Sequence, residues 1–366
     1  MRRALRNLRG DLRVALGYVL KPLLGRGEYA THLDATGISS VLICRINARL
    51  GNALFLTPLI ERIHALLPNA VIDLAIGYPK ANDLLAGVPG IRRIIRFPYK
   101  GVHIVWRYLA ALRAVRRERY DLVIDPTPHS TSGRTVLALC RARYKLGFAV
   151  ASQWAPLTHA VPPPDARTHQ AVQPIELLSR ALQVDFDPGA VRLWLPLRPE
   201  EIEAGRAAIA RAIRCGEETE RLSRVFSFFA HATGFKTVGR AFWIAFWDAF
   251  LELEPDVIPV EFLPGPATPP TDSRFASLHV PSQRALTAAV AATRMFISAD
   301  AGPMHLASTT PVPTIALFRA TEPALYGPLK PSDVVIDVRT STARETAEIC
   351  RRAWQAARPA FRRNEA

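Results

Sequence analysis

Short apolar runs alternate with amphipathic helical segments from residue 41 onward. The first three runs are rich in β-branched residues and predict strands: VLICRI (41–46), VIDLAIG (71–77) and YDLVIDPTP (120–128). Each is followed by a segment whose apolar residues recur at helical spacing. Strands that alternate with helices in this way predict a parallel sheet covered by helices on both faces.

The first block ends with a proline-rich patch and a helix predicted over 168–183. The next segment, DFDPGAVRLWLP (185–196), is typical of an interdomain connection. A second block of the same kind begins within it, near residue 191. It contains four predicted strands: RVFSFFAHATG (224–234), DVIPVEFLPG (256–265), RMFISADAGP (294–303) and VPTIALFRATEP (312–323). Two Rossmann-like domains with a cleft between them, over 38–190 and 191–345, explain both blocks, and a C-terminal helix is expected over 346–366.

Aromatic residues are concentrated in one predicted helix of the second block, AFWIAFWDAFLELEP (241–255). Trp243, Phe246, Trp247 and Phe250 recur at i, i+3, i+4 and i+7, which places them on one face. We interpret this face as part of a hydrophobic core and not as a cofactor site.

The leading segment, residues 1–30, predicts a basic amphipathic helix. Six apolar residues share one face, and four arginines lie beside it: Leu5, Leu8, Leu12, Leu16, Val19 and Leu23, with Arg2, Arg6, Arg9 and Arg13. Such a helix is suited to an anionic bilayer surface, and it is equally suited to packing on the body of the protein. Charges interrupt its apolar residues, so it does not resemble a signal peptide. No apolar run of the sequence is long enough to span a membrane.

The formal net charge of +15 and the isoelectric point near 10.3 indicate an anionic partner: nucleic acid, anionic lipid or a phosphorylated substrate. The sequence has no basic–aromatic sheet signature, helix-turn-helix or zinc pattern, which argues against nucleic acid. Four scattered cysteines, Cys44, Cys140, Cys215 and Cys350, argue against zinc and disulfides and favour a reducing compartment. The first predicted strand is not followed by Gly-x-Gly-x-x-Gly, which argues against a dinucleotide-dependent dehydrogenase.

The strongest candidate site follows the strand in FISADAGPMHLAS (296–308). The strand is predicted to end at Asp300, and Pro303 is expected at the first position of a helix. Free backbone amides at the start of that helix would suit a diphosphate, and Asp300 would accept hydrogen bonds from sugar hydroxyls. The amides expected to be free are those of Ala301, Gly302, Met304 and His305. The alternative is an Asp-capped helix that binds nothing, with His305 packed on its own helix.

A second loop in the same block, HATGFKTVGR (231–240), offers a hydroxyl at Thr233, close backbone approach at Gly234 and a cation at Lys236. These features suit a phosphate, although a lysine near a turn is usually only solvated.

Two loops of the first block are further candidates. In RINARLGN (45–52), Gly51 is expected to permit a tight turn and Asn52 to cap the following helix, while Arg45 and Arg49 supply positive charge. In DLVIDPTPHSTSGR (121–134), Asp125 and His129 follow a strand, and either side chain could face the cleft. A histidine in a proline-rich loop is more often a surface residue.

These four loops, in this order, resemble glycosyltransferase family 9, the ADP-heptose:lipopolysaccharide heptosyltransferases. The resemblance runs from about residue 41 to about residue 328 and is most specific in RLGNALFLTPLIERIHALLPNAVIDLAIG and DAGPMHLASTTPVPTIALFRATEPALYGP. It implies an α/β protein of the GT-B fold, with two Rossmann-like domains and no metal requirement. It also implies inverting transfer of a sugar from a nucleotide-diphosphate donor, expected to be ADP-heptose, to a lipopolysaccharide core or related glycolipid.

The resemblance also implies roles for individual residues. Asp300 would contact the donor sugar, the backbone at Ala301, Gly302 and Pro303–Met304 its diphosphate, and Thr233 and Lys236 the phosphates. Phe318 and Thr321 would lie in the loop beside the nucleotide. Two positions depart from the family pattern there, since Arg319 replaces a glycine and Glu322 an aspartate.

A third departure concerns catalysis. The family's usual aspartate, the candidate general base, is Asn52 in this chain. An amide cannot accept a proton near neutral pH, and general-base assistance is worth roughly a hundredfold or more. Asp125 or His129 would then take the proton, or stabilisation of the departing diphosphate would drive the reaction. The alternative is a catalytically silent relative that binds nucleotide sugar or glycolipid. An active enzyme is expected to be cytoplasmic, peripheral on the inner membrane.

Overall fold

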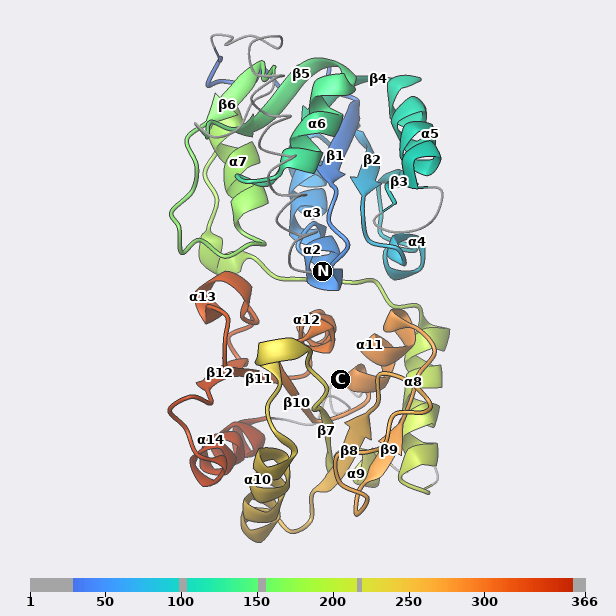
Figure 1. Ribbon diagram of the computed structural model, residues 1–366, viewed down its shortest axis with the longest axis vertical. Helices are drawn as coiled ribbons and strands as arrows, with labels where there is room; N and C mark the ends of the chain where they lie inside the picture. Colours follow the sequence, from blue (N-terminus) through green and yellow to red (C-terminus); the bar gives the residue numbers. More distant parts are fainter. Residues whose placement is uncertain (1–28, 99–103, 151–155, 216–218, 358–366) are drawn as a thin grey trace, which may run out of the picture. The chain divides into compact units, whose positions relative to one another are not determined.

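The computed structural model describes residues 29–98, 104–150, 156–215 and 219–357 (Figure 1). The predicted leading helix lies almost wholly outside the described residues, as do residues 358–366. The chain forms two compact units. Unit 1 comprises Met1–Asn82 and Val88–Val191, and unit 2 comprises Asp83–Gly87 and Arg192–Ala366.

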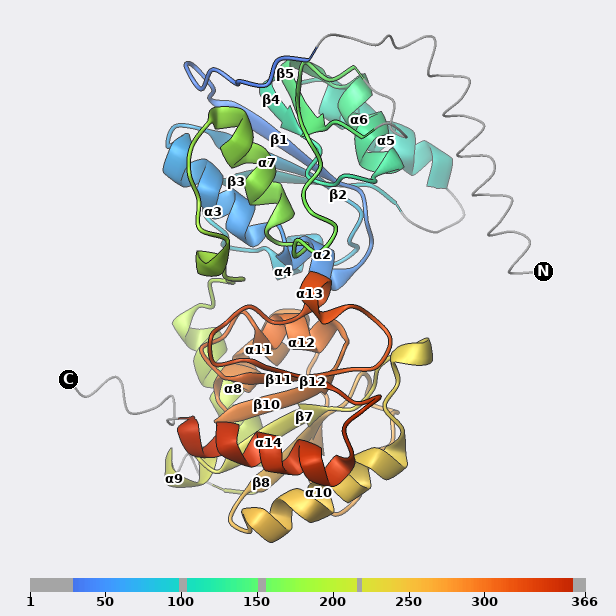
Figure 2. The same cartoon turned by 90° about the vertical axis from the view of Figure 1, so that its left-hand side faces the viewer.

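Unit 1 contains a six-stranded parallel sheet in the order β3-β2-β1-β4-β5-β6. The strands are β1 (Ser40–Arg45), β2 (Val71–Ile76), β3 (Ile91–Arg96), β4 (Arg119–Ile124), β5 (Arg141–Phe148) and β6 (His159–Val161). The helices are α2 (Leu50–Leu54), α3 (Thr57–Leu66), α4 (Ala81–Leu84), α5 (Ile104–Arg116), α6 (Thr131–Leu139) and α7 (Gln173–Leu182). Helices α5 and α6 cover one face of the sheet, and α3 and α7 cover the other (Figure 2).

Unit 2 repeats this arrangement with a parallel sheet in the order β12-β11-β10-β7-β8-β9. Its strands are β7 (Val225–Phe229), β8 (Ile258–Phe262), β9 (Ala276–Leu278), β10 (Met295–Ala299), β11 (Thr314–Phe318) and β12 (Val334–Asp337). Its helices are α8 (Pro199–Ala212), α9 (Thr219–Leu222), α10 (Arg240–Leu253), α11 (Gln283–Ala291), α12 (Gly302–Ala307), α13 (Pro323–Tyr326) and α14 (Ala343–Ala356), with a 3₁₀ turn η2 (Gly234–Lys236). Another 3₁₀ turn, η1 (Pro188–Ala190), lies at the end of unit 1.

The core of unit 2 explains why its strands are continuous apolar runs. A strand buried on both faces sends alternate side chains to opposite sides, so every position tends to be apolar. Phe226 and Phe228 of β7 pack with α10 and α14, whereas Val225 and Phe229 pack with α8 and α11. The predicted aromatic face of α10 is confirmed as core: Trp243, Phe246, Trp247 and Phe250 are each no more than 1% exposed.

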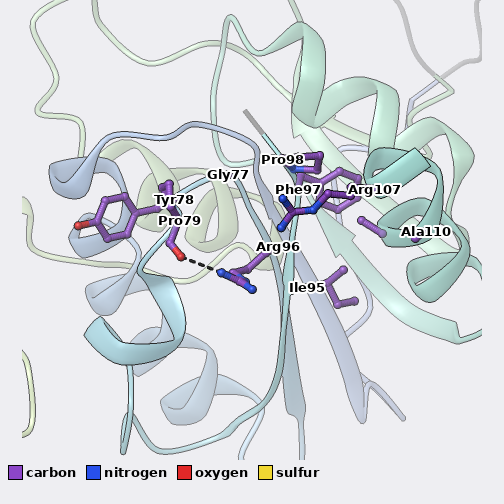
Figure 3. Close-up of a pocket in the computed structure, with 10 residues that line it drawn as sticks. Gly77, Tyr78, Pro79, Ile95, Arg96, Phe97, Pro98, Arg107 and Ala110 are labelled. Atoms are coloured by element: carbon purple, nitrogen blue, oxygen red, sulfur yellow. Dashed lines mark hydrogen bonds between the residues drawn. The ribbon is translucent and has the colours of Figure 1, made fainter. Parts of the chain in front are cut away.

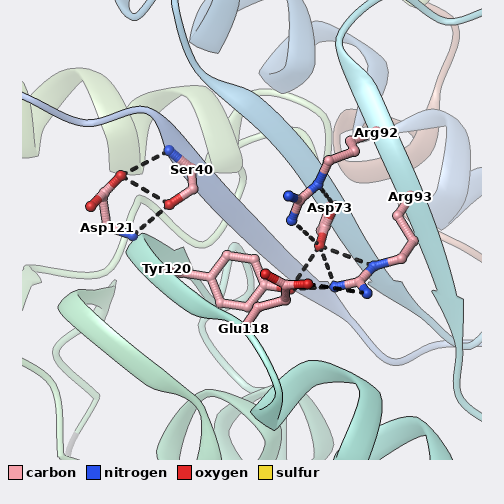
Figure 4. A network of polar contacts seen from close by, with 7 residues as sticks. All are labelled: Ser40, Asp73, Arg92, Arg93, Glu118, Tyr120 and Asp121. Carbon is pink, nitrogen blue, oxygen red and sulfur yellow. Dashed lines mark hydrogen bonds and ion pairs between the residues drawn. The ribbon is translucent and has the colours of Figure 1, made fainter.

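A buried polar network near the amino ends of the unit 1 strands fixes their register (Figure 4). The Asp73 carboxylate on β2 accepts hydrogen bonds from Arg92 and Arg93 on β3 and from the Tyr120 hydroxyl on β4. Burial alone would raise the pKa of Asp73, but these hydrogen bonds outweigh it and hold that pKa below its usual value. Because this network lies at the amino ends of the strands, it is structural and leaves the carboxyl ends open to other uses.

Among the helices that the structure describes, none combines the length and the apolar character needed to cross a bilayer.

Candidate functional site

The four predicted loops all lie where the strand order of a sheet reverses. The sheet of unit 1 reverses between β1 and β4, and that of unit 2 between β7 and β10. Connections from such neighbouring strands leave toward opposite faces and open a crevice at the carboxyl ends, which is where doubly wound sheets bind ligands. The segments that follow β1 and β4 contain Asn52 and Asp125, and those that follow β7 and β10 contain Lys236 and Asp300.

In unit 2 these loops bring together three residues that are far apart in the sequence. The Lys236 ammonium lies 2.7 Å from the Asp300 carboxylate, and the Thr321 hydroxyl donates to the same carboxylate. The Asp300 side chain is 4% exposed and that of Lys236 is 28% exposed. The cluster therefore presents a partly accessible cation held by a buried carboxylate, at the end of the sheet where a ligand is expected.

Helix α12 starts differently from the prediction. Its N-cap is Ala301, so Pro303 occupies the second helical position and not the first. The amide of Met304 donates to the Ala301 carbonyl, so the expectation that it is free is wrong. The alternative of an Asp-capped helix is also wrong, because no side chain caps α12 and Asp300 instead contacts Lys236 and Thr321. The side chain of His305 is buried.

The remaining donor-side residues divide between surface and core. Thr233 is exposed at the start of η2, and Gly234 adopts a positive φ of 64°, which suits glycine there. Phe318 is buried with Met304 and Ala316, so its side chain packs in the core and does not line the crevice.

Sequence reasoning did not foresee that Arg319, which replaces the family's glycine, donates to the Thr237 carbonyl at 2.8 Å and thereby links the loops after β7 and β11.

In unit 1 the loop after β1 corrects the prediction for Gly51 and Asn52. Helix α2 begins at Leu50 with Arg49 as its N-cap, so both residues lie inside the helix. Gly51 makes no tight turn, and Asn52 caps nothing. The capping-type contact belongs to Asn47, whose side-chain oxygen accepts from the Arg49 amide at 3.0 Å.

Asn52 is instead held by Arg45. The buried Arg45 guanidinium donates to the Asn52 carboxamide oxygen at 2.9 Å and to the Thr127 hydroxyl at 2.6 Å. The loops after β1 and β4 are therefore joined through one arginine. Because the Asn52 oxygen is engaged, its NH₂ group remains as a hydrogen-bond donor. The structure thus gives Arg45 a positioning role that charge alone did not specify.

Asp125 and His129 lie in different environments. Asp125 is fully buried, and its carboxylate pairs with Arg134 at 2.9 Å. Burial raises the pKa of Asp125 to about 6, against the opposing effect of Arg134. His129 is exposed on the turn that follows. Asp125 therefore links the end of β4 to α6 inside the fold, whereas His129 is accessible to solvent.

Sequence reasoning also missed a pocket of about 510 Å³ at the carboxyl ends of β2 and β3 (Figure 3). Two guanidiniums line it, from Arg96 at the end of β3 and Arg107 on α5, among apolar side chains that include Phe97. Arg96 also donates to the Pro79 carbonyl. Gly77 at its rim allows the loop after β1 to approach, because a Cβ there would lie 2.8 Å from the Asn47 amide. Two arginines in an apolar wall suit a carboxylate or phosphate.

Within the described residues, no group of three or more His, Cys, Asp or Glu side chains is arranged to bind a metal ion.

Two parallel sheets, each with a reversal of strand order and polar loops at its carboxyl ends, form the GT-B architecture, and solved structures of that fold match the chain. One is a glycosyltransferase family 9 protein from Veillonella parvula, with a TM-score of 0.72, 17% identity, and coverage of 90% of this chain and 100% of that one. Another is Escherichia coli heptosyltransferase WaaC with ADP, with a TM-score of 0.66, 16% identity, and coverage of 86% and 100%. A third is E. coli ADP-heptose lps heptosyltransferase II, with a TM-score of 0.65, 15% identity, and coverage of 87% and 99%.

Residues 283–353 match the model of glycosyltransferase family 9 (heptosyltransferase). This match includes the loop after β10 and the loop after β11, and it confirms the resemblance that the motifs predicted. No curated protein sequence matched the chain. Family match and fold together indicate a heptosyltransferase-like glycosyltransferase.

Proposed function

We propose that this protein transfers a sugar, heptose, from ADP-heptose to a lipopolysaccharide core or related glycolipid, with inversion at the anomeric carbon. The observation that carries the proposal is the Lys236–Asp300–Thr321 cluster at the reversal of the unit 2 sheet. Support for an adenine nucleotide comes from the match to WaaC, whose structure contains ADP.

The cluster suits both halves of such a donor. The partly exposed Lys236 ammonium offers charge-assisted hydrogen bonds to a diphosphate, and the Asp300 carboxylate accepts hydrogen bonds from sugar hydroxyls. In the reaction the bond from the anomeric carbon to the diphosphate oxygen breaks, and the acceptor hydroxyl oxygen bonds to that carbon. Negative charge then grows on the diphosphate, where Lys236 stabilises it.

Unit 1 supplies features for an anionic acceptor. The pocket with Arg96 and Arg107 suits the phosphates or acidic sugars of a glycolipid. Asn52, whose oxygen is held by Arg45, can donate to the oxygen of the attacking hydroxyl but cannot take its proton. We therefore propose that departure of the diphosphate leads the reaction and that the hydroxyl proton leaves to solvent after the sugar–phosphate bond has largely broken.

We further propose that the enzyme acts at the cytoplasmic face of the inner membrane, since the glycolipid acceptor is anchored there. The net charge of +15 would concentrate both an anionic lipid surface and an anionic donor near the protein.

The proposal is tested by offering purified full-length protein ADP-, GDP- and UDP-linked sugars in a calorimetric screen, followed by transfer of labelled sugar to core-oligosaccharide lipids. We expect ADP-heptose to bind and to be turned over, and Lys236→Met to weaken that binding. Absence of nucleotide-sugar binding would overturn the donor site. Binding without transfer to any lipopolysaccharide acceptor would overturn the proposed activity.

A further inference from the structure

Helix α5 exposes apolar side chains on its outer side. Val105 is 63% exposed, Trp106 is 73% exposed and Leu109 is 42% exposed. The opposite side of the same helix is buried against the sheet through Ala111 and Val115. The side of α5 that faces the sheet contributes to the hydrophobic core of unit 1. The exposed tryptophan, valine and leucine on the other side add nothing to that core, so the folding of unit 1 does not account for them.

The exposed side chains follow helical spacing and end in positive charge. Val105 and Leu109 are four residues apart and Trp106 lies between them, so the three gather on the first two turns. Arg113 and Arg116 follow on the last turns and are exposed, as is Arg117 just beyond the helix. The helix contains no acidic residue, and among the described residues none of these three arginines forms an ion pair.

The exposed apolar side chains and the arginines of α5 together favour one kind of partner. Exposed apolar groups of this kind mark interaction sites on soluble proteins. A surface that combines a tryptophan, aliphatic side chains and unpaired arginines matches the interface of an anionic bilayer, where indole rings lie among headgroups and arginines lie beside lipid phosphates. A protein partner would need acidic groups to match the arginines, whereas the chain itself carries a net charge of +15, which disfavours a second copy.

We infer that α5 is a membrane-docking helix: Trp106 and Leu109 enter the headgroup region of an anionic bilayer, and Arg113 and Arg116 contact lipid phosphates. The other side of the same helix contributes Arg107 and Ala110 to the pocket at the ends of β2 and β3 (Figure 3). A bilayer on α5 would thus lie next to that pocket. Docking does not depend on the proposed transfer activity, because lipid adsorption is measured without any donor.

The test uses full-length protein and two kinds of vesicle, pure phosphatidylcholine and phosphatidylcholine with 30 mol% (about a third) phosphatidylglycerol. We expect adsorption to the anionic vesicles only. Trp106→Ser with Leu109→Ser should weaken that adsorption about tenfold or more, since an apolar anchor is lost. Arg113→Gln and Arg116→Gln should each weaken it about fivefold at low salt and less at high salt. The matched control is Ile202→Ser with Val335→Ser, two exposed apolar residues of unit 2, which should leave adsorption unchanged.

A direct readout separates α5 from any other adsorbing segment. Lipids brominated near the headgroup should quench the fluorescence of Trp106, measured as the difference between the native chain and Trp106→Phe. The inference is wrong if that difference shows no quenching on bound vesicles. It is also wrong if Trp106→Ser with Leu109→Ser lowers the melting temperature or changes the oligomeric mass and leaves adsorption intact, because α5 would then be covered by another part of the chain or by a second copy.

Discussion

Replacing Lys236 by methionine and Asp300 by asparagine should change the binding of ADP in opposite directions. The two side chains form one ion pair at 2.7 Å, in which the lysine is the more accessible partner. A diphosphate that binds this cluster gains the ammonium as a donor but approaches the carboxylate as a like charge. The pair therefore contributes one favourable and one unfavourable interaction to a ligand that lacks a sugar.

The magnitudes follow from those two interactions. A hydrogen bond to a charged group is worth about 1.5–3 kcal/mol, and partial exposure of Lys236 favours the lower end, so Lys236→Met should raise the Kd for ADP about 10- to 30-fold. A carboxylate about 6 Å from a phosphate charge costs about 1–3 kcal/mol at the intermediate dielectric of a partly exposed site. Asp300→Asn should therefore tighten ADP severalfold, while it weakens ADP-heptose relative to ADP because sugar contacts are lost.

Isothermal titration calorimetry with ADP and with ADP-heptose, at low and at high ionic strength, measures these effects. Lys80→Met is the matched control, since Lys80 is an exposed lysine on a turn of unit 1. Both effects should shrink at high salt, as interactions of partly exposed charges do. An unchanged Kd for ADP in Lys236→Met, or weaker ADP binding in Asp300→Asn, would refute the electrostatic role given to this cluster.

Three further predictions concern turnover and stability. Asn52→Asp should change kcat by less than about tenfold in the transfer assay, because the hydroxyl proton leaves late and Arg45 holds the new carboxylate, and a rise of about a hundredfold would show that proton removal limits the native enzyme. The pKa of Asp125 is raised to about 6, so the folded protein holds this proton more tightly than the unfolded chain does. The free energy of unfolding should therefore fall by about 3 kcal/mol as pH rises from 4 through 6. Urea titrations at several pH values measure this dependence, and Asp125→Asn should largely remove it. Arg284→Met should destabilise unit 2 by about 3 kcal/mol at neutral pH, because the Glu201 carboxylate then keeps, among the described residues, only the exposed Arg198 as an ion-pair partner. The pKa of Glu201 is lowered to about 2, chiefly by Arg284, so the native pair should weaken only as pH falls from 4.5 toward 2. A loss below about 1 kcal/mol would contradict this role of Arg284.

The strands that the sequence predicted are those at the centre of each sheet. Strands β1, β2 and β4 in unit 1, and β7, β8, β10 and β11 in unit 2, read as apolar runs because helices bury both of their faces. The strands without a clear signal, β3, β5, β6, β9 and β12, lie at the sheet edges or next to them. The exposed side of β3 explains its sequence, IRRIIR, in which arginines interrupt the apolar pattern.

The sequence predicted which loops carry the candidate site, but it did not predict which side chains in those loops contact one another. A polar motif directly after a buried strand places Lys236 and Asp300 at the carboxyl edge of a sheet, whichever residues they then meet. Their ion pair depends on which strands are neighbours, and no local pattern contains that information. The error at Asn52 has a local cause: an asparagine before an apolar run resembles an N-cap, but Asn47 already orders the Arg49 amide and the helix begins earlier.

The contact between Arg45 and Asn52 also constrains how an acceptor hydroxyl can be oriented. The guanidinium turns the carboxamide oxygen toward Arg45, which leaves the NH₂ group as a donor to a lone pair of a hydroxyl oxygen. A hydroxyl held in this way keeps its proton while its other lone pair is free to attack. Such an arrangement favours a nucleophile that remains neutral until the anomeric carbon has become cationic, which requires strong stabilisation of the departing diphosphate. The absence of a carboxylate at position 52 is therefore consistent with the proposed reaction, in which the acceptor hydroxyl loses its proton late, and a new carboxylate in Asn52→Asp should gain little in kcat.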